Sequence, residues 1–112
     1  MTDLATLARS YFDKVRARDA DAIAAMFAEG GVLVLPYGAQ FEGTAAIAAF
    51  YRDLFARNPP TPEVVATLTE GRRCLVQLVA RQADGAEAHA ADVFTFDVDG
   101  RIAELVIYTR QA

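Results

Sequence analysis

The chain has 112 residues, of which 54% are hydrophobic and 23% charged, and its formal net charge is −4. This length and composition are typical of one folded domain with a modest core, and they exclude a disordered chain. The negative charge argues against nucleic acid or an anionic membrane as a partner, and no apolar run is long enough to span a bilayer.

The cysteine content and the first residues of the chain indicate the cellular compartment. A single cysteine, Cys74, excludes an internal disulfide and a cysteine-based zinc site, and its apolar neighbours indicate a packing role. The first residues, Met1–Leu4, lack the basic region and apolar core of a signal peptide. We therefore expect a cytoplasmic protein without a metal or cofactor.

The first predicted element is an amphipathic helix that begins after Thr2 or Asp3, either of which can cap it. Its apolar stripe follows a period of 3.6 residues and comprises Leu4, Leu7, Ala8, Tyr11, Phe12 and Val15. Tyr11 is the one member of the stripe with a polar tip, and a buried tyrosine hydroxyl generally needs a partner. We expect Tyr11 to meet a polar group inside the fold, unless its hydroxyl reaches the surface or bonds a backbone carbonyl.

Two further helices are predicted before residue 58. Asp19 caps a short one, which Gly30-Gly31 ends, and its inward residues are Ala22, Ile23, Met26 and Phe27. A short strand at 32–35 and a turn at Pro36-Tyr37-Gly38 follow. Thr44 then caps a third helix with a second stripe that contains one tyrosine: Ile47, Phe50, Tyr51, Leu54 and Phe55.

The second half of the chain is predicted to be strands. Proline-rich residues 57–62 form a surface connection, and the period then changes to two in segments 63–70, 74–81 and the strand that contains Asp92. Residues 97–100 turn the chain into a last strand, 101–109. Three helices followed by an antiparallel meander predict an α+β fold with the helices on one face of the sheet.

The segment Ala90–Asp97 contains a carboxyl group on an apolar face. Alternation places Asp92, Phe94 and Phe96 on one side of the strand. A carboxyl group there is costly unless it is hydrogen-bonded or neutral, and burial raises its pKa, so Asp92 is a candidate site residue. The alternatives are that Asp92 lies at a rim of the sheet or that the register slips by one residue and turns it to solvent.

Several familiar catalytic arrangements are missing from the sequence. It has no glycine-rich phosphate loop after a strand, no paired His or Cys spacing for a metal, and no G-x-S-x-G motif. The one histidine, His89, lies three residues before Asp92 and therefore on the opposite face of the strand. We expect His89 on an outer or subunit-contact surface and not in a His–Asp dyad.

Three polar groups remain, each placed singly on an apolar stripe: Tyr11, Tyr51 and Asp92. If the helices cover one face of a curved sheet, the three stripes converge on one cavity. Phenols and a neutral carboxylic acid are hydrogen-bond donors, and two donors directed at one carbonyl oxygen make an oxyanion hole.

The sequence resembles the nuclear transport factor 2-like superfamily, in the branch of ketosteroid isomerases and SnoaL-type polyketide cyclases. The resemblance runs nearly end to end through segments that are weak singly and specific together: Arg9–Phe12, Arg18–Ile23, Met26–Glu29, Pro36–Gly38, Glu42–Ile47, Phe50-Tyr51, Asp92–Phe96 and Asp99–Ile102. It implies a single domain over residues 1–112 in which three helices pack on a strongly curved, antiparallel or mixed sheet. The resulting cone-like barrel has a deep apolar pocket, and such domains commonly form homodimers through the outer face of the sheet.

The resemblance also implies roles for individual residues. Tyr11 matches the phenol of the isomerase oxyanion hole, Asp92 its protonated carboxylic acid, and Tyr51 the tyrosine that supports the phenol. In ketosteroid isomerase an apolar site keeps this carboxylic acid neutral. The expected walls of the pocket are Leu35, Phe50, Phe94, Leu105 and Ile107.

One departure from the isomerase pattern concerns the proton shuttle. The isomerases have an aspartate directly before the Pro-x-Gly turn, and this chain has Leu35. A general base typically contributes about 10²–10⁴-fold, and leucine cannot take a proton. Phe27 also replaces a tyrosine of the supporting network. Glu42, Tyr37 and Gln40 are the candidates for a replacement base, although no motif places them.

These observations predict a ketosteroid-isomerase-like protein that binds a small apolar carbonyl or phenol compound, such as a steroid, through Tyr11 and Asp92. If it is an enzyme, the expected class is an isomerase of the steroid Δ-isomerase type that acts through an enolate. The alternatives are a non-catalytic ligand-binding or dimerisation module of the same fold, or a related cyclase, dehydratase or hydrolase.

Overall fold

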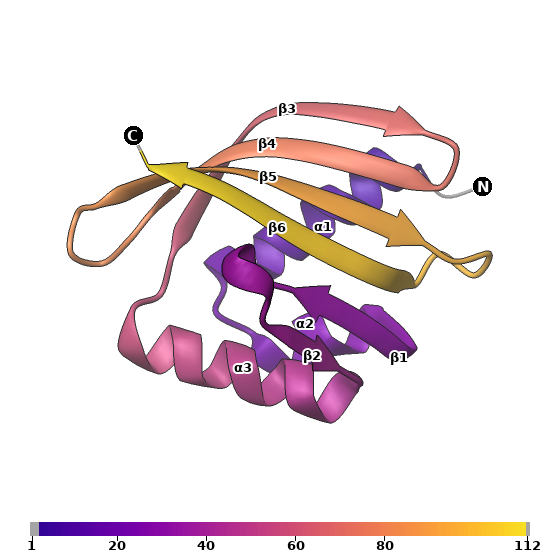
Figure 1. Ribbon diagram of the computed structural model, residues 1–112, viewed down its shortest axis with the longest axis horizontal. Helices are drawn as coiled ribbons and strands as arrows, with labels where there is room; N and C mark the ends of the chain where they lie inside the picture. Colours follow the sequence, from indigo (N-terminus) through magenta and orange to yellow (C-terminus); the bar gives the residue numbers. More distant parts are fainter. Residues whose placement is uncertain (1–2, 112) are drawn as a thin grey trace.

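Three helices cover one face of a curled six-stranded sheet in the computed structural model, which describes residues 3–111 (Figure 1). The helices are α1 (Leu4–Arg16), α2 (Ala20–Ala25) and α3 (Thr44–Arg57). The strands are β1 (Phe27–Val34), β2 (Gln40–Glu42), β3 (Thr61–Glu70), β4 (Arg73–Arg81), β5 (Glu87–Phe96) and β6 (Ile102–Gln111), and a short 3₁₀ turn, η1 (Pro36–Gly38), joins β1 to β2. The predicted α+β class, with helices packed on one face of a mixed sheet, is confirmed.

The strands follow the order β2-β1-β6-β5-β4-β3. All neighbouring pairs are antiparallel except β1 and β6, which run parallel. The sheet curls over the helices without closing into a complete barrel (Figure 1). This curl gives the sheet a concave inner face toward the helices and an outer face that no helix of residues 3–111 covers.

Helix α1 follows the predicted stripe. The Asp3 carboxylate caps it by accepting a hydrogen bond from the backbone N–H of Ala5 at 3.2 Å. Four members of the stripe are buried, namely Ala8, Tyr11, Phe12 and Val15, and Leu4 and Leu7 are half-buried beside them. The helix is therefore held by its apolar face, and that face carries Tyr11 inward.

The predicted end of the second helix is wrong. Helix α2 ends at Ala25, and β1 begins at Phe27 and runs through both Gly30 and Gly31. The register between β1 and β6 shifts between Phe27 and Val32, so this stretch of β1 departs from regular pairing with β6. A Cβ atom on Gly31 would lie 2.8 Å from the carbonyl oxygen of Ile102, so this position requires glycine. The glycine pair therefore accommodates close strand packing and does not cap a helix.

Three smaller expectations also need correction. The N-cap of α3 is Gly43, whose φ is 90°, and Thr44 is the first helical residue and makes no side-chain cap bond. The short strand β2 was not predicted. Thr61 and Pro62 belong to β3 and not to a loop, and a proline is tolerated there because β3 is an edge strand.

The inner face of β5 has the predicted alternation. Asp92 pairs with Val76 of β4 and Ile107 of β6, so all three residues share one face. Asp92, Phe94 and Phe96 are buried, and the rings of Phe94 and Phe96 stack with centroids 5.8 Å apart. His89, at the opposite phase of β5, lies on the outer face, where it lines a shallow hollow with Leu75 and Tyr108.

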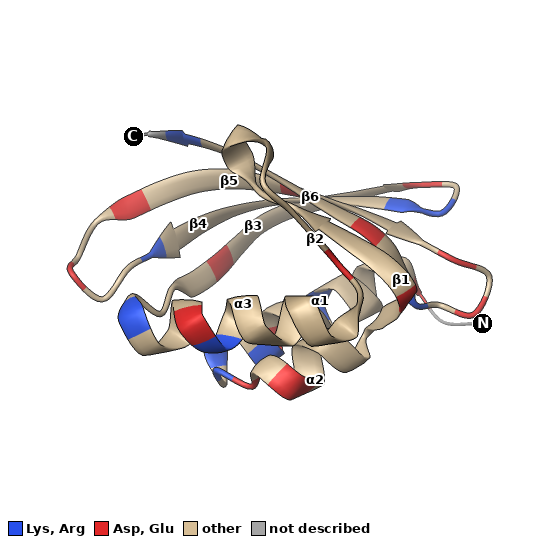
Figure 2. Cartoon of the chain, turned by 60° about the horizontal axis from the view of Figure 1, so that its bottom comes forward, with Lys and Arg blue, Asp and Glu red and all other residues tan. Residues whose placement is uncertain are grey.

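Charged residues occur along the helices, in the connecting loops and toward the ends of the strands (Figure 2). Several form exposed ion pairs, such as Arg52 of α3 with Asp21 of α2 at 2.6 Å, and pairs of this kind typically add less than about 1 kcal/mol. Within residues 3–111, no helix is long and apolar enough to cross a membrane. The stability of the fold therefore depends mainly on the apolar layer between the helices and the sheet.

Candidate functional site

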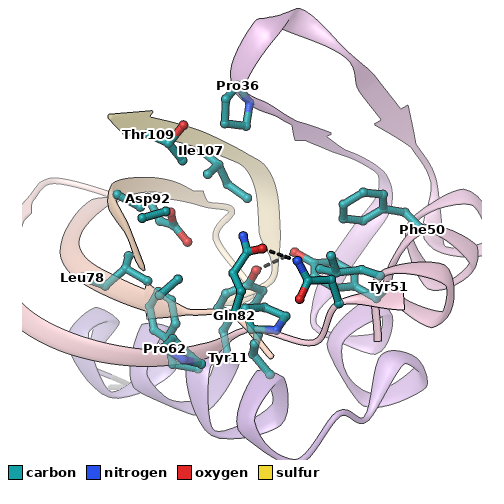
Figure 3. Close-up of a pocket in the computed structure, with 18 residues that line it drawn as sticks. Tyr11, Pro36, Phe50, Tyr51, Pro62, Leu78, Gln82, Asp92, Ile107 and Thr109 are labelled. Atoms are coloured by element: carbon teal, nitrogen blue, oxygen red, sulfur yellow. Dashed lines mark hydrogen bonds between the residues drawn. The ribbon is translucent and has the colours of Figure 1, made fainter. Parts of the chain in front are cut away.

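A cavity of about 220 Å³ lies between the inner face of the sheet and helices α1 and α3 (Figure 3). Its walls are mostly apolar, and they include Phe50 and Leu54 of α3, Leu78 of β4 and Ile107 of β6. Tyr11, Tyr51 and Asp92 line the same cavity. The fold thus brings the phenols of two residues on different helices and the carboxyl group of one strand residue into the same apolar cavity.

The two tyrosines are bonded to each other. The hydroxyl oxygens of Tyr11 and Tyr51 lie 2.5 Å apart, and both residues are buried. Each hydroxyl has one hydrogen and two lone pairs, and either can be the donor in this bond. Whichever hydroxyl donates, the other keeps its hydrogen, so the pair retains one O–H that can bond to a ligand.

Aromatic packing fixes the position of Tyr11. The edges and faces of Tyr11, Phe12 and Phe94 meet in T-shaped contacts, with the Tyr11–Phe94 centroids 5.2 Å apart. Burial, together with Tyr51 and Asp92 nearby, raises the pKa of Tyr11 well above its ordinary value. Burial also raises the pKa of Tyr51. Both phenols therefore stay protonated and serve as donors across the physiological pH range.

Asp92 is a buried carboxyl group without a protein partner. Its exposed fraction is 4%, and it makes no hydrogen bond with any residue of the described chain. Burial raises the pKa of Asp92 from 3.8 to about 8, so the neutral acid predominates at pH 7. Because Asp92 lines the cavity, a ligand bound there can accept the hydrogen of this acid.

The predicted wall residues divide into two groups. Phe50 and Ile107 line the cavity. Leu35, Phe94 and Leu105 do not line it: Phe94 and Leu105 are fully buried in the core, and Leu35 is half-buried against that core. The sequence pattern identified the correct face for Phe94 and Leu105 but could not show how deeply they are packed.

The candidates for a replacement base lie away from the cavity. Tyr37 is 97% exposed, Gln40 and Glu42 are also exposed, and none of the three lines the cavity. Among the described residues, Asp92 is the one carboxyl group in the cavity wall. The same part of the chain contains no group of three His, Cys, Asp or Glu side chains that could hold a metal ion.

Sequence reasoning missed three polar residues of the wall: Asn58, Gln82 and Thr109 of β6. Asn58, at the C-terminal end of α3, and Gln82, in the β4–β5 connection, both line the cavity and are bonded to each other through their side-chain amides. Asn58 stands in the proline-rich connection and Gln82 beside a turn signal, where no periodicity assigns a direction to a side chain. Only the tertiary structure shows that they meet.

The fold and this site define a SnoaL-like domain. The family model for the SnoaL-like domain matches residues 8–105, and the chain belongs to that family, within the nuclear transport factor 2-like superfamily. This confirms the predicted resemblance. A comparison with curated proteins found no match.

Solved structures agree with this assignment. A protein from Sphaerobacter thermophilus is 34% identical, with 95% of this chain and 94% of that chain covered and a TM-score of 0.81. A putative polyketide cyclase from Sinorhizobium meliloti is 27% identical, with 96% and 95% covered and a TM-score of 0.81. A putative ketosteroid isomerase from Kribbella flavida is 23% identical, with 97% and 78% covered and a TM-score of 0.85, and this likeness shows the fold alone.

The raised pKa of Asp92 predicts a specific dependence of stability on pH. The unfolded chain releases this proton near pH 4 and the folded chain near pH 8, so the free energy of unfolding falls as pH rises through that window. Between about pH 5 and pH 9 the free energy of unfolding of the wild type should fall by about 3–4 kcal/mol more than that of Asp92→Asn, which has no acid at this position. Urea unfolding at both pH values measures the difference.

The exposed Asp99 offers a matched control on the hairpin after β5. Asp99→Asn should reproduce the wild-type dependence on pH. If Asp92→Asn and the wild type instead lose the same stability over this range, Asp92 titrates alike in the folded and unfolded chains and its assignment as a neutral acid is wrong.

Proposed function

We propose that this protein binds a small apolar compound with a carbonyl or phenol oxygen, in the manner of a ketosteroid isomerase. The ligand oxygen accepts one hydrogen bond from protonated Asp92 and a second from the free O–H of the Tyr11–Tyr51 pair. The observation that carries this proposal is the buried Asp92 carboxyl group, which has no partner in the described chain and lines the same apolar cavity as both phenols.

This pair of donors suits an oxygen that gains negative charge. In an apolar cavity, fixed donors directed at a developing enolate or phenolate act in a low dielectric and stabilise it by several kcal/mol. The apolar walls formed by Phe50, Leu78 and Ile107 favour a flat hydrocarbon body around that oxygen. Recognition in this proposal therefore combines one polar contact with apolar burial.

Isomerisation would need a base in addition to the two donors. An isomerase of this type needs a base that carries a proton between two carbons, and the corresponding position is Leu35. Since Tyr37, Gln40 and Glu42 lie away from the cavity, the described residues offer the two proposed oxyanion donors with no shuttle base beside them. We propose ligand binding as the first function, with isomerisation at background rate.

A cyclase is the second candidate, favoured by the 27% identical protein named a putative polyketide cyclase. In this case ionised Asp92 acts as the base that takes a proton from carbon, since its pKa of about 8 is close to physiological pH. The two functions depend on opposite protonation states of Asp92. Binding through the neutral acid weakens above pH 8, and catalysis by the carboxylate increases over the same range.

Binding is tested with 2-naphthol, a fluorescent phenol, titrated with the protein between about pH 6 and pH 9. The wild type should show saturable binding that weakens above about pH 8, because ionised Asp92 no longer donates. Tyr11→Phe and Asp92→Leu should each weaken binding about five- to tenfold, the effect of one hydrogen bond in an apolar site. Asp92→Asn keeps a donor and should lose the dependence on pH.

The matched controls are Tyr37→Phe and Asp99→Asn, which change an exposed tyrosine and an exposed aspartate and should bind as the wild type does. If 2-naphthol fails to saturate, or if the Tyr11 and Asp92 variants bind like the controls, the binding proposal is contradicted.

The missing base is tested by the appearance of a conjugated enone from 3-cyclohexen-1-one and from a Δ5-3-ketosteroid. The wild type should give background rates. Leu35 lies outside the cavity wall but directly precedes Pro36, which lines it, so the shorter, charged side chain of Leu35→Asp can turn toward the cavity and should raise the rate at least tenfold, toward the roughly 10²–10⁴-fold of a typical general base. Leu35→Asn is the control of similar size without a base. Wild-type turnover above background and equal to that of Leu35→Asp would show that another residue already supplies the base, and background turnover by both would show that position 35 does not reach the cavity.

We also propose that two copies of the chain associate through the outer face of the sheet. Leu75, Val93 and Val106 lie in line across β4, β5 and β6 on that face, and Tyr108 beside them is 59% exposed. A two-fold axis through this row lets the same apolar surface meet itself. Support comes from this patch and from the absence of a helix over it among the described residues.

Light scattering after size-exclusion chromatography tests this association. The wild type should have the mass of two chains, and Leu75→Arg should have the mass of one because it places a charge in the centre of the contact. Val98→Arg, on an exposed hairpin away from the sheet face, is the control and should remain dimeric. A wild-type mass of one chain contradicts the proposal.

A further inference from the structure

The amide pair of Asn58 and Gln82 has a defined orientation. The backbone N–H of Ala83 donates to the side-chain oxygen of Asn58 at 3.2 Å, which leaves the Asn58 amide nitrogen to point the other way. That nitrogen donates to the side-chain oxygen of Gln82. Since a backbone N–H can only donate, it fixes the orientation of Asn58, and Asn58 in turn fixes that of Gln82.

This chain of bonds leaves the amide nitrogen of Gln82 free. Within the part of the chain whose side chains are described, the Gln82 amide nitrogen has no hydrogen-bond partner, and Gln82 lines the cavity. Figure 3 shows this nitrogen pointing away from the bonded oxygen, on the side of the cavity where Asp92 and Ile107 lie. The cavity thus has N–H donors here in addition to the Tyr11–Tyr51 and Asp92 donors.

The size of the cavity limits what can bridge the two groups of donors. Its volume of about 220 Å³ is below the roughly 300–1,000 Å³ that is typical of pockets for drug-sized ligands. A body of one or two rings fits this volume better than a four-ring steroid. While Asp92 is protonated, this acid, the tyrosine pair and the Gln82 amide each have a donor to offer a ligand, so a complementary ligand carries acceptors.

Building on the proposed function, we infer that the ligand is a one- or two-ring compound with two acceptor oxygens. One oxygen bonds to Asp92 and the tyrosine pair, and a second acceptor, such as a ketone, accepts from the Gln82 amide. Gln82 is then a specificity-determining residue, and Asn58 is a positioning residue that keeps the Gln82 nitrogen directed into the cavity. Gln82 is half-buried, so a ligand that covers its amide without accepting from it replaces water and leaves the donor unpaired, which disfavours ligands of the same shape that lack the second acceptor.

The test compares ligands of equal shape by calorimetry. One pair is 6-acetyl-2-naphthol and 6-isopropenyl-2-naphthol, and a shorter pair is 4-hydroxyacetophenone and 4-isopropenylphenol. In each pair a C=CH₂ group replaces the ketone. For each protein the preference is the ratio of its affinity for the ketone to its affinity for the C=CH₂ compound. In at least one pair this ratio should be about three- to tenfold larger for the wild type than for Gln82→Leu, which has no donor at this position.

Asn58→Asp gives a second readout that a purely structural role would not produce. The new carboxylate still accepts from Ala83 but can no longer donate to Gln82, so the Gln82 amide turns and presents its oxygen to the cavity. The preference for the ketone should disappear or reverse while both ligands still bind. Thr61→Ser, an exposed change nearby on β3, is the control and should keep the wild-type preference.

The outcomes separate this inference from the proposed function. If both members of each pair bind with dependence on Asp92 but neither pair shows a preference that Gln82→Leu or Asn58→Asp removes, the inference about Gln82 is overturned and the proposed function stands. If no member of either pair binds, both are overturned.

Discussion

The site depends on a carboxyl group that the fold removes from water without providing a partner. Transfer of an ionised carboxylate into an apolar environment is so unfavourable that the group takes up a proton instead. Asp92 is in this position because strand alternation directs it inward between Val76 and Ile107, against the layer of α1 and α3. Neutral Asp92 is a donor, and this one property makes the cavity suitable for a carbonyl or phenol oxygen.

The remaining structure serves to keep that donor dry and aligned. The curled sheet provides the concave face, and glycine at position 31, within the irregular stretch of β1, lets β1 pack closely against β6. Tyr11 and Tyr51 come from two different helices, and their mutual bond satisfies one hydroxyl hydrogen while it leaves the other free. Under the proposed function a cavity with these properties binds neutral acceptors, and the raised pKa of Asp92 makes the stability of the protein decrease as Asp92 ionises.

Much of this arrangement could be predicted from sequence, because it depends on periodicity. The stripe of α1, the alternation around Asp92 and the placement of His89 on the outer face follow from periods of 3.6 and two residues. Features without a period were missed or misread. A glycine pair such as Gly30-Gly31 is compatible both with a helix end and with an irregular strand, so the sequence could not distinguish them. Asn58 and Gln82 are brought together only by tertiary packing. Periodicity also does not show how deeply a side chain is buried. Phe94 was therefore expected in the cavity wall, whereas it lies in the core.

The central claim is that Asp92 is a neutral acid at physiological pH, and its own titration tests this most directly. Carbon-13 NMR of the aspartate side-chain carboxyl groups, assigned by comparison with Asp92→Asn, follows the ionisation of each group with pH. One aspartate should titrate with a pKa of about 8, and its signal should be missing in that variant. A pKa near 4 for Asp92 would show a hydrated or bonded carboxylate and would contradict the donor role on which the proposed function depends.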